Sequence, residues 1–255
     1  MSNQFANICE EFIVDDIHSG RYGLFVISTD DRYDEVDTGI SYSISTTTGI
    51  NGLNFVEEIK DEGFKFELKV TRYYNNTWFP LDDDFVKEIN MWLLKKKQRK
   101  LIIGDKIYYG YFTSCKRTFD RYLTYSFEMP NSYCVCIGER DIICDGNRDI
   151  QLKCIDEIEE YSYLEITIDN IKSEDVIVKN ISNNIYFQIS NLKEGQKIKY
   201  FCDTGEIYNE NDDNENIYAN LIKNKNMILN HGFNRLKIQG KCHINFKWYD
   251  KVGVI

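Results

Sequence analysis

The side chains best suited to general acid–base chemistry are three histidines, His18, His231 and His243, and adjacent carboxylates such as Asp30–Asp31 and Glu159–Glu160. Nucleophilic catalysis needs a base beside a Ser or Cys and a third group that orients the base. The sequence contains no G-x-S-x-G elbow, no H-E-x-x-H motif and no phosphate-binding loop. Adjacent carboxylates in an acidic chain usually lie on solvated faces rather than forming a glycosidase pair. We therefore predict that the chain has no catalytic residue, binds no cofactor and is not an enzyme.

Cysteine is the second residue type that could carry chemistry, because thiolates bind metals. The sequence contains Cys9, Cys115, Cys134, Cys136, Cys144, Cys154, Cys202 and Cys242. The closest approach to a metal pattern is C-x-C-x7-C-x9-C, which begins at Cys134 and matches no zinc module. The segment Met1–Asp16 lacks the basic and apolar regions of a secretory signal, so we expect reduced thiols. Buried free cysteines are the favoured interpretation, and no metal site is predicted.

An acidic, Asn-rich stretch at residues 203–216 could bind Ca²⁺. Its carboxylates are Asp203, Glu206, Glu210, Asp212, Asp213 and Glu215. They lack the D-x-[DN]-x-[DN]-G-x5-E order of a calcium loop. A solvated loop is the favoured interpretation, and calcium binding stays open.

Charge and hydropathy narrow the classes of partner. The formal net charge is −10, which disfavours binding to a nucleic-acid backbone or to anionic lipid. No apolar run of 18 residues occurs, so we predict no membrane span and no nucleic-acid sequence recognition.

Most of the chain has the pattern of β-strands. Only two prolines occur, at Pro80 and Pro130, and alternation of apolar with polar residues recurs throughout. The clearest strand is Phe64–Val70, and Asn75–Asn76 is typical of a hairpin turn leading to Trp78–Phe79. The other predicted strands include 23–28, 40–45, 101–103, 106–112, 122–129, 164–168, 185–189, 197–201, 235–240 and 242–249. The sequence therefore predicts a mainly β protein.

One helix is predicted near residues 83–97. Phe85, Ile89, Trp92 and Leu93 form an apolar stripe, and Asp82, Asp83 and Asp84 precede it, where an aspartate can cap free amides. The basic residues at its far end are Lys95, Lys96, Lys97, Arg99 and Lys100. This cluster complements the negative end of the helix dipole; an anion site is the less favoured interpretation.

The pattern breaks at Pro130-Asn131-Ser132, where we place a domain boundary. The predicted domains are residues 1–133 and 134–255. Short alternating strands on both sides of this boundary are typical of sandwiches or jelly rolls.

Two motifs follow one another in a definite order. The first joins the helix end Ile89–Leu93 to a hairpin over Lys100–Tyr111 that contains Gly104-Asp105 and Tyr108-Tyr109-Gly110. The second comprises Asp203–Tyr208, the pair Asn220-Leu221, and a strand entry formed by Leu229, Gly232, Asn234, Leu236, Ile238 and Gly240. Together they resemble the distal tail protein family of siphophages that infect Gram-positive bacteria. The stretch at Asp203 is shorter than in the family, and residues 1–60 match only in strand spacing.

The resemblance implies a structural role at the phage tail tip, or baseplate. Residues 1–133 would form an N-terminal β-sandwich domain with one helix, which assembles as a hexameric ring. Residues 134–255 would form a C-terminal galectin-like β-sandwich, or jelly roll. The implied partners are other copies of the chain, the tail tube protein, the tape measure protein, and the tail hub or tail-associated protein. The implied location is the tail tip of the virion, after synthesis in the cytoplasm of the bacterial host.

A galectin-like fold raises the question of sugar binding. His231, Asn234 and Arg235 have the spacing H-x-x-N-R, whereas galectins have H-x-N-x-R, and Trp248 comes too late in the sequence. Turn chemistry explains Gly232 and Asn234 better.

Ring contacts are heterologous and close on themselves, so each subunit shows two different faces. We place candidate contacts in the loop Asp34–Asn54 and in the hairpin Arg72–Phe79. The predicted interface residues are Asp34, Ser43, Ser45, Thr47, Asn54, Tyr73, Tyr74, Trp78 and Phe79. Two alternatives stay open: a carbohydrate-binding or receptor-binding β-sandwich protein of the virion, and a baseplate component of a contractile tail or tailocin.

Overall fold

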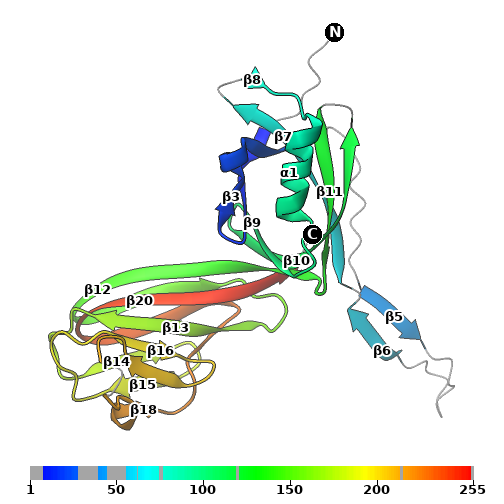
Figure 1. The fold of residues 1–255 in the computed structure, drawn as a ribbon. Coiled ribbons are helices and arrows are strands. Elements are labelled where there is room, and N and C mark those ends of the chain that lie inside the picture. Colours follow the sequence, from blue (N-terminus) through cyan, green and yellow to red (C-terminus); the bar gives the residue numbers. More distant parts are fainter. Residues whose placement is uncertain are drawn as a thin grey trace, which may run out of the picture. The chain divides into compact units, whose positions relative to one another are not determined.

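The computed structural model describes residues 8–27, 40–44, 56–61, 63–74, 77–118, 121–212 and 215–253; for 8, 9, 40–44, 56–61 and 74 it describes the backbone alone. The chain is mainly β with a single α-helix among these residues (Figure 1). This confirms the predicted fold class. The chain divides into two compact units. The first comprises Met1–Cys134 with Gly253–Ile255, and the second comprises Val135–Val252.

The first unit contains two sets of antiparallel strands. One set pairs in the order β1 (Ile8–Glu10), β4 (Leu24–Ile27), β7 (Phe64–Tyr74), β11 (Tyr122–Met129) and β10 (Lys106–Thr118). The other set pairs in the order β10, β9 (Arg99–Ile103), β2 (Phe12–Val14) and β3 (Ile17–His18). The 3-10 turn Ser19–Tyr22 follows β3. Separately, β5 (Ile40–Ile44) pairs with β6 (Val56–Asp61), and β8 (Thr77–Trp78) pairs with the end of β7.

One long strand, β10, belongs to both sets and changes partner at Gly110. Residues Lys106–Gly110 pair with β9, and the pairing with β11 begins at Tyr111. Gly110 lies so close to β11 that a Cβ there would stand 2.4 Å from the carbonyl oxygen of Glu128 and 2.7 Å from the ring of Phe127. Only glycine therefore fits where the strand turns from one sheet to the next.

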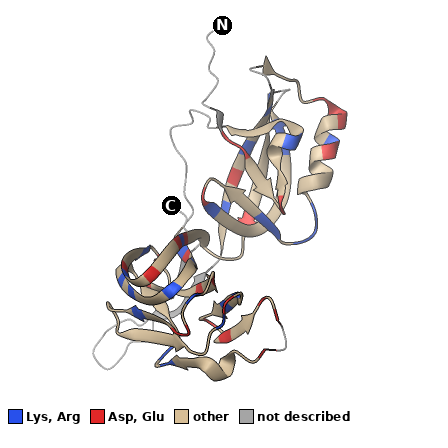
Figure 2. Cartoon of the chain, turned by 90° about the vertical axis from the view of Figure 1, so that its left-hand side faces the viewer, with Lys and Arg blue, Asp and Glu red and all other residues tan. Residues whose placement is uncertain are grey.

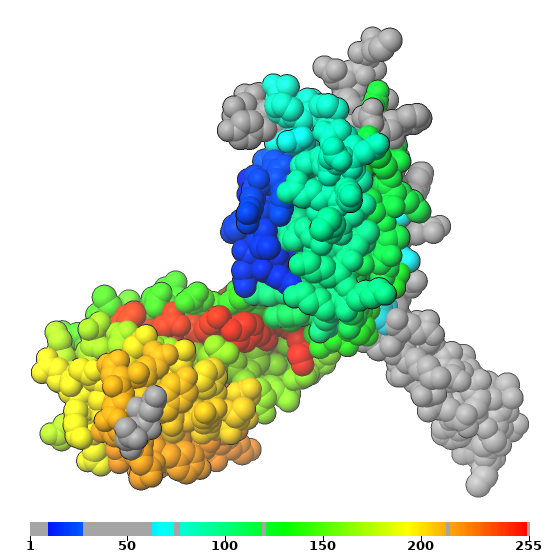
Figure 3. Space-filling view, in the orientation of Figure 1, coloured from blue at the N-terminus to red at the C-terminus, as the bar shows by residue number. Residues whose placement is uncertain are grey.

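The helix α1 (Asp83–Leu93) begins as the sequence predicts. The Asp82 Oδ1 accepts a hydrogen bond from the Phe85 amide at 2.8 Å, and the four residues of the apolar stripe are buried. Trp92 stacks on Phe12 of β2 with ring centroids 5.9 Å apart. In Figure 3 the surface of α1 accordingly lies beside the N-terminal strands, drawn in blue. The helix thus covers one side of the core of this unit.

The predicted helix end near Lys97 is wrong, because α1 ends at Leu93. Leu94 leaves the helical region with φ −81° and ψ 55°. The buried guanidinium of Arg99 donates to the carbonyl oxygens of Trp92 and Leu93 at 2.7 and 3.3 Å. A side chain that takes up carbonyls of the last turn replaces the amides that a longer helix would supply.

The second unit is built in the same way from β12 (Tyr133–Cys154) onward. One set of antiparallel strands pairs β20 (Gly232–Gly253), β13 (Tyr161–Asp169), β16 (Ile198–Phe201) and β17 (Glu206–Asn209). The other pairs β20, β14 (Val176–Asn180), β15 (Ile185–Ile189) and β18 (Leu221–Lys223). β19 (Ile228–Asn230) pairs with the start of β13, and the 3-10 turn Tyr218–Asn220 precedes β18. β12 pairs with β20, and Figure 1 shows these two 22-residue strands side by side.

Here β20 is the strand shared by both sets, and again it changes partner at a glycine. Leu236–Gln239 pair with β14, and His243–Trp248 pair with β13. Gly240, between them, has φ +131°, which only glycine adopts readily. Alternate residues of each strand point inward, as Leu164, Ile166 and Ile168 do in β13, and fill one apolar core.

Candidate functional site

The hairpin of β7 and β8 carries the predicted interface residues that the structure describes in full. Tyr73 stands opposite Trp78, and their ring centroids are 4.9 Å apart. Tyr73 also meets the edge of Phe25 on β4 at 6.1 Å. Trp78 is 38% exposed and Phe79 is 39% exposed, so both rings are anchored at one side and face solvent at the other. Half-exposed aromatic groups of this kind suit a protein–protein contact.

The other predicted interface residues cannot be placed beside them. Asp34, Ser45, Thr47 and Asn54 lie outside the described residues, as does the predicted Asn75–Asn76 turn. Ser43 lies in β5 opposite Glu58, and Tyr74 lies in β7 opposite Thr77, each described by its backbone alone. The structure therefore brings together Tyr73, Trp78 and Phe79, and the interface role of all nine residues stays a prediction.

A cleft next to this hairpin was not predicted from the sequence. It has a volume of about 490 Å³ and is lined by Gly20, Arg21, Tyr22, Gly23, Arg72, Phe79, Phe85 and Glu88. The guanidinium carbon of Arg72 lies 4.2 Å from the centroid of the Phe85 ring and 5.7 Å from the centroid of the Phe79 ring. The signal in the sequence was an arginine followed by two tyrosines, Tyr73 and Tyr74, but its stacking partner on α1, Phe85, lies 13 residues away.

The basic cluster after α1 is largely matched by acidic residues of the turn between β2 and β3. Asp15 Oδ2 lies 2.8 Å from Arg99 Nε and 2.9 Å from Lys97 Nζ, and Asp15 Oδ1 accepts from the Lys100 amide at 3.0 Å. Burial acts to raise the pKa of Asp15, but the hydrogen bonds from Lys97, Lys100 and Arg99 prevail and lower it. Figure 2 shows acidic residues at the start of α1 and basic residues in the loop after its end. These contacts support helix-end complementarity over an anion site.

The galectin-like trio does not form a sugar site. Asn234 is fully buried: its Oδ1 accepts from the Asn230 amide at 2.9 Å, and its Nδ2 donates to the Asn230 carbonyl at 2.6 Å. His231 Nδ1 contacts the Asp156 carbonyl oxygen at 2.9 Å, and Arg235 pairs with Asp149 at 2.6 Å. Asn234 thus closes the turn into β20, as the turn interpretation predicts.

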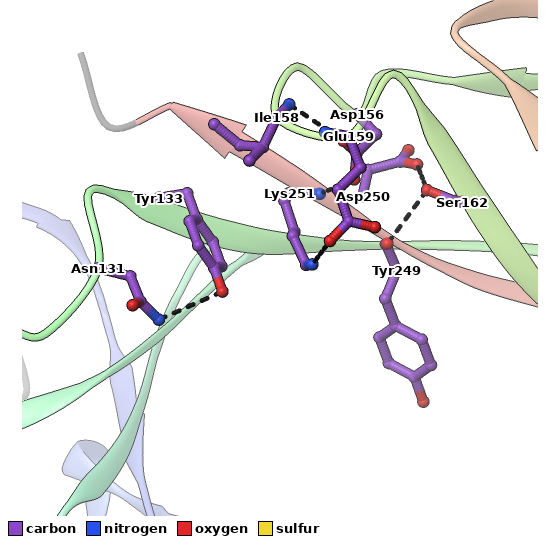
Figure 4. A network of polar contacts seen from close by, with 9 residues as sticks. All are labelled: Asn131, Tyr133, Asp156, Ile158, Glu159, Ser162, Tyr249, Asp250 and Lys251. Atoms are coloured by element: carbon purple, nitrogen blue, oxygen red, sulfur yellow. Dashed lines mark hydrogen bonds and ion pairs between the residues drawn. The ribbon is translucent and has the colours of Figure 1, made fainter. Parts of the chain in front are cut away.

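A buried polar network holds the end of β20 to the loop after β12 (Figure 4). Asp250 is 2% exposed and accepts hydrogen bonds from Ser162 Oγ at 2.5 Å, the Ile155 amide at 3.0 Å and Trp248 Nε1 at 3.1 Å. Asp156 accepts from the amides of Ile158, Glu159 and Lys251 at 3.1, 2.7 and 2.7 Å. Both carboxylate oxygens of Asp250 and of Asp156 accept a hydrogen bond, so the role of this network is to hold the fold together.

The possible metal ligands are dispersed. Cys134, Cys136, Cys144, Cys154, Cys202 and Cys242 are buried, Cys115 is partly buried, and the side chain of Cys9 is not described. In the acidic stretch, Glu215 accepts from Gln196 and Asn209 at 2.6 and 2.9 Å, and Glu210 pairs with Lys197 at 2.7 Å. Among the residues that the structure describes, no three His, Cys, Asp or Glu side chains are grouped to hold a metal ion. No helix in the same residues is long and apolar enough to cross a membrane.

Comparison with known proteins finds a family match within the first unit. Residues 7–129 match the family described as phage tail protein N-terminal domain. No curated protein matches the chain by sequence. The crystal structure of the SPP1 Dit (gp 19.1) protein, called a paradigm of the hub adsorption apparatus in phages infecting Gram-positive bacteria, superposes with a TM-score of 0.58 at 11% identity. That match covers 95% of this chain and 98% of the SPP1 chain. A chain of the phage p2 baseplate in its activated conformation with Sr gives a TM-score of 0.48 at 12% identity, covering 96% and 99%.

Proposed function

Residues 7–129 match the phage tail protein N-terminal domain family, and from that match we propose that this chain is the distal tail protein of a siphophage. Its role in the virion tail is structural. The proposed finer role is a hexameric adaptor ring that joins the tail tube and tape measure protein to the tail hub. Synthesis in the host cytoplasm is part of the same proposal.

Two matches together carry the proposal: a family match to the first part of the chain, and a match in fold to nearly the whole chain. The family match covers 7–129, which lies within the first unit. The likeness in fold to SPP1 Dit covers nearly all of both chains, including the second unit. This supports a two-domain distal tail protein with a ring-forming domain at 1–133 and a galectin-like domain at 134–255.

The described surface suits assembly better than catalysis. The hairpin of β7 and β8 exposes aromatic rings, while the buried carboxylates of Asp156 and Asp250 are already hydrogen-bonded within the fold. We assign one face of the ring contact to Tyr73, Trp78 and Phe79, because anchored, half-exposed aromatic residues can contribute strongly to an interface at small entropic cost.

The test is the mass of the full chain in solution, measured by light scattering over a range of concentrations with and without the tail tube and hub proteins, together with negative-stain images. The expected result is a closed ring of six subunits. Trp78→Ser should raise the protein concentration needed to form this ring at least tenfold. Ile143→Ser, which removes an apolar residue that is 73% exposed in the second unit, is the matched control. A chain that stays monomeric even with both partner proteins would refute the ring.

A second candidate, carbohydrate binding, has one observation in its favour. Tyr161, Tyr163 and Tyr249 border a hollow of about 220 Å³ that also exposes Glu165 and Asp203. Tyr163 and Tyr249 are each 37% exposed, and aromatic faces beside carboxylates suit a sugar ring. Binding of the chain to a glycan array, abolished by Tyr163→Ala, would favour this reading; an array without signal would remove it.

A further inference from the structure

The cleft beside the β7–β8 hairpin holds two cationic groups that lack an acidic partner. Arg72 and Arg21 line it, and neither guanidinium forms an ion pair or a hydrogen bond with any described residue. Among the described residues that line the cleft, Glu88 is the only one with a carboxylate, so this lining carries one excess positive charge in a chain whose net charge is −10. Most other arginines of the first unit do have partners, as Arg99 does with Asp15 and Arg117 with Asp83.

Arg72 is held in place although no described residue forms an ion pair with it. Its guanidinium lies 4.2 Å from the centroid of the Phe85 ring, at the start of α1. Its backbone carbonyl accepts from the Phe79 amide at 3.1 Å, and the next amide, that of Tyr73, donates to Gly23 at 2.8 Å. A stacked, oriented guanidinium presents its N–H groups in a fixed fork, which fits a carboxylate in two parallel hydrogen bonds.

Building on the ring that we propose above, we infer that this cleft receives a carboxylate side chain from a second copy of the chain. Arg72 would bind the carboxylate with its fork, and Arg21, at the exposed rim, would add a second positive charge.

Two features of the chain favour another copy as the occupant. The sequence contains 41 Asp and Glu against 31 Lys and Arg, so the surface of a neighbouring copy offers carboxylates in excess. The cleft is also continuous with the exposed aromatic hairpin, because Phe79 belongs to both. An aromatic contact flanked by a charge pair is a common arrangement, in which the charges fix orientation and register.

The test measures the concentration at which the full chain forms its ring, with tail tube protein present where assembly needs it. Arg72→Gln and Arg21→Gln should each raise that concentration at least tenfold, and the rise should shrink as salt is added. Arg72→Lys should raise the concentration as Arg72→Gln does, because the lysine ammonium cannot form the two parallel hydrogen bonds of a guanidinium. Arg140→Gln, at an exposed arginine of β12, is the matched control and should assemble like the wild type.

Arg72 also packs on Phe85, so its loss could disturb folding rather than assembly. Labelling of the wild-type protein with phenylglyoxal, which modifies guanidinium groups, avoids this difficulty. Peptide mapping should show Arg21 and Arg72 protected in the ring compared with the monomer, and Arg140 labelled equally in both.

The outcomes separate this inference from the proposed function. A wild-type chain that never forms a ring overturns both. A ring that forms equally well with Arg72→Gln and Arg21→Gln, or that leaves both arginines open to phenylglyoxal, overturns only this inference. Rings of these variants that form normally but no longer recruit hub protein would reassign the cleft to the hub and also overturn the second copy as occupant.

Discussion

The contact between Arg99 and Asp15 offers a quantitative test, because Arg99 of β9 binds both the last carbonyls of α1 and the turn between β2 and β3. Arg99 is 1% exposed, whereas the Asp15 side chain is 26% exposed. Asp15→Asn should leave the buried guanidinium without its counter-charge. Asp15 has φ +47°, a conformation that asparagine also tolerates, so the backbone should not be strained.

The expected cost follows from the contacts that each change removes. Breaking a fully buried pair costs about 3–5 kcal/mol, and the partial exposure of Asp15 places Asp15→Asn nearer 2 kcal/mol. Arg99→Met loses the pair and also the hydrogen bonds to the Trp92 and Leu93 carbonyls, at roughly 1 kcal/mol each, for a total of about 4 kcal/mol. The double variant should cost at least about 1 kcal/mol less than the sum of the single changes.

The assay is native-state hydrogen exchange of the amides of α1, which reports on the first unit separately from the second. Asp16→Asn is the control, because Asp16 is 89% exposed and its nitrogen–oxygen distance to Lys100 is 3.9 Å.

The pKa of Asp15 is lowered in the folded protein. The stabilisation by Asp15 is therefore present above the pKa of the unfolded chain and is lost as the pH falls through the pKa of the folded protein. The penalty of Asp15→Asn should therefore shrink below about pH 3.8. Additive single changes, or a penalty independent of pH down to pH 2, would contradict this account.

Two further substitutions and one labelling experiment test the second unit. Gly138→Ala should destabilise it by about 2–3 kcal/mol in urea unfolding, because a Cβ there would stand 2.0 Å from the indole of Trp248; a change below about 0.5 kcal/mol would show that the indole moves aside. Asn234→Ala should cost about 1–3 kcal/mol by the same measurement, since it removes the hydrogen bonds from the buried Asn234 side chain to the amide and carbonyl of Asn230, and a neutral result would mean that the turn re-forms without them. Burial raises the pKa of Cys154 to about 11, so at pH 8 its thiol should react with Ellman's reagent only as the unit opens, later than the partly buried Cys115; equal rates would contradict the packing described.

The sequence predicted local structure wherever one pattern was decisive. The run of aspartates 82–84 and the stripe from Phe85 to Leu93 placed the start and inner face of α1 correctly, and the structure shows that Asp82 is the cap. The end of α1 was misjudged, because a run of lysines is compatible with helix, whereas the stop is imposed by Arg99 from the following strand. A contact set by tertiary structure leaves little trace in local periodicity.

The candidate site was less accessible to sequence reasoning for the same physical reason. The hairpin aromatics Trp78 and Phe79 could be proposed from composition alone. The cleft required knowing that Arg72, Arg21 and Phe85 converge from a strand, a turn and a helix. Motif glycines such as Gly110 and Gly240 appeared in the sequence as turn or strand-entry residues, and their position at the strand crossings became evident only with the pairing partners known.

The strands β10 and β20, each of which belongs to two sets of paired strands, determine how the protein should unfold under mechanical force. Because β10 and β20 run without interruption past Gly110 and Gly240, neither sheet of a unit can peel away without disrupting hydrogen bonds in the other. Each unit should therefore rupture as a whole in a single-molecule pulling experiment, with no intermediate in which one sheet survives. Such all-or-none behaviour would let the protein keep its shape under a load until the load exceeds the strength of an entire unit.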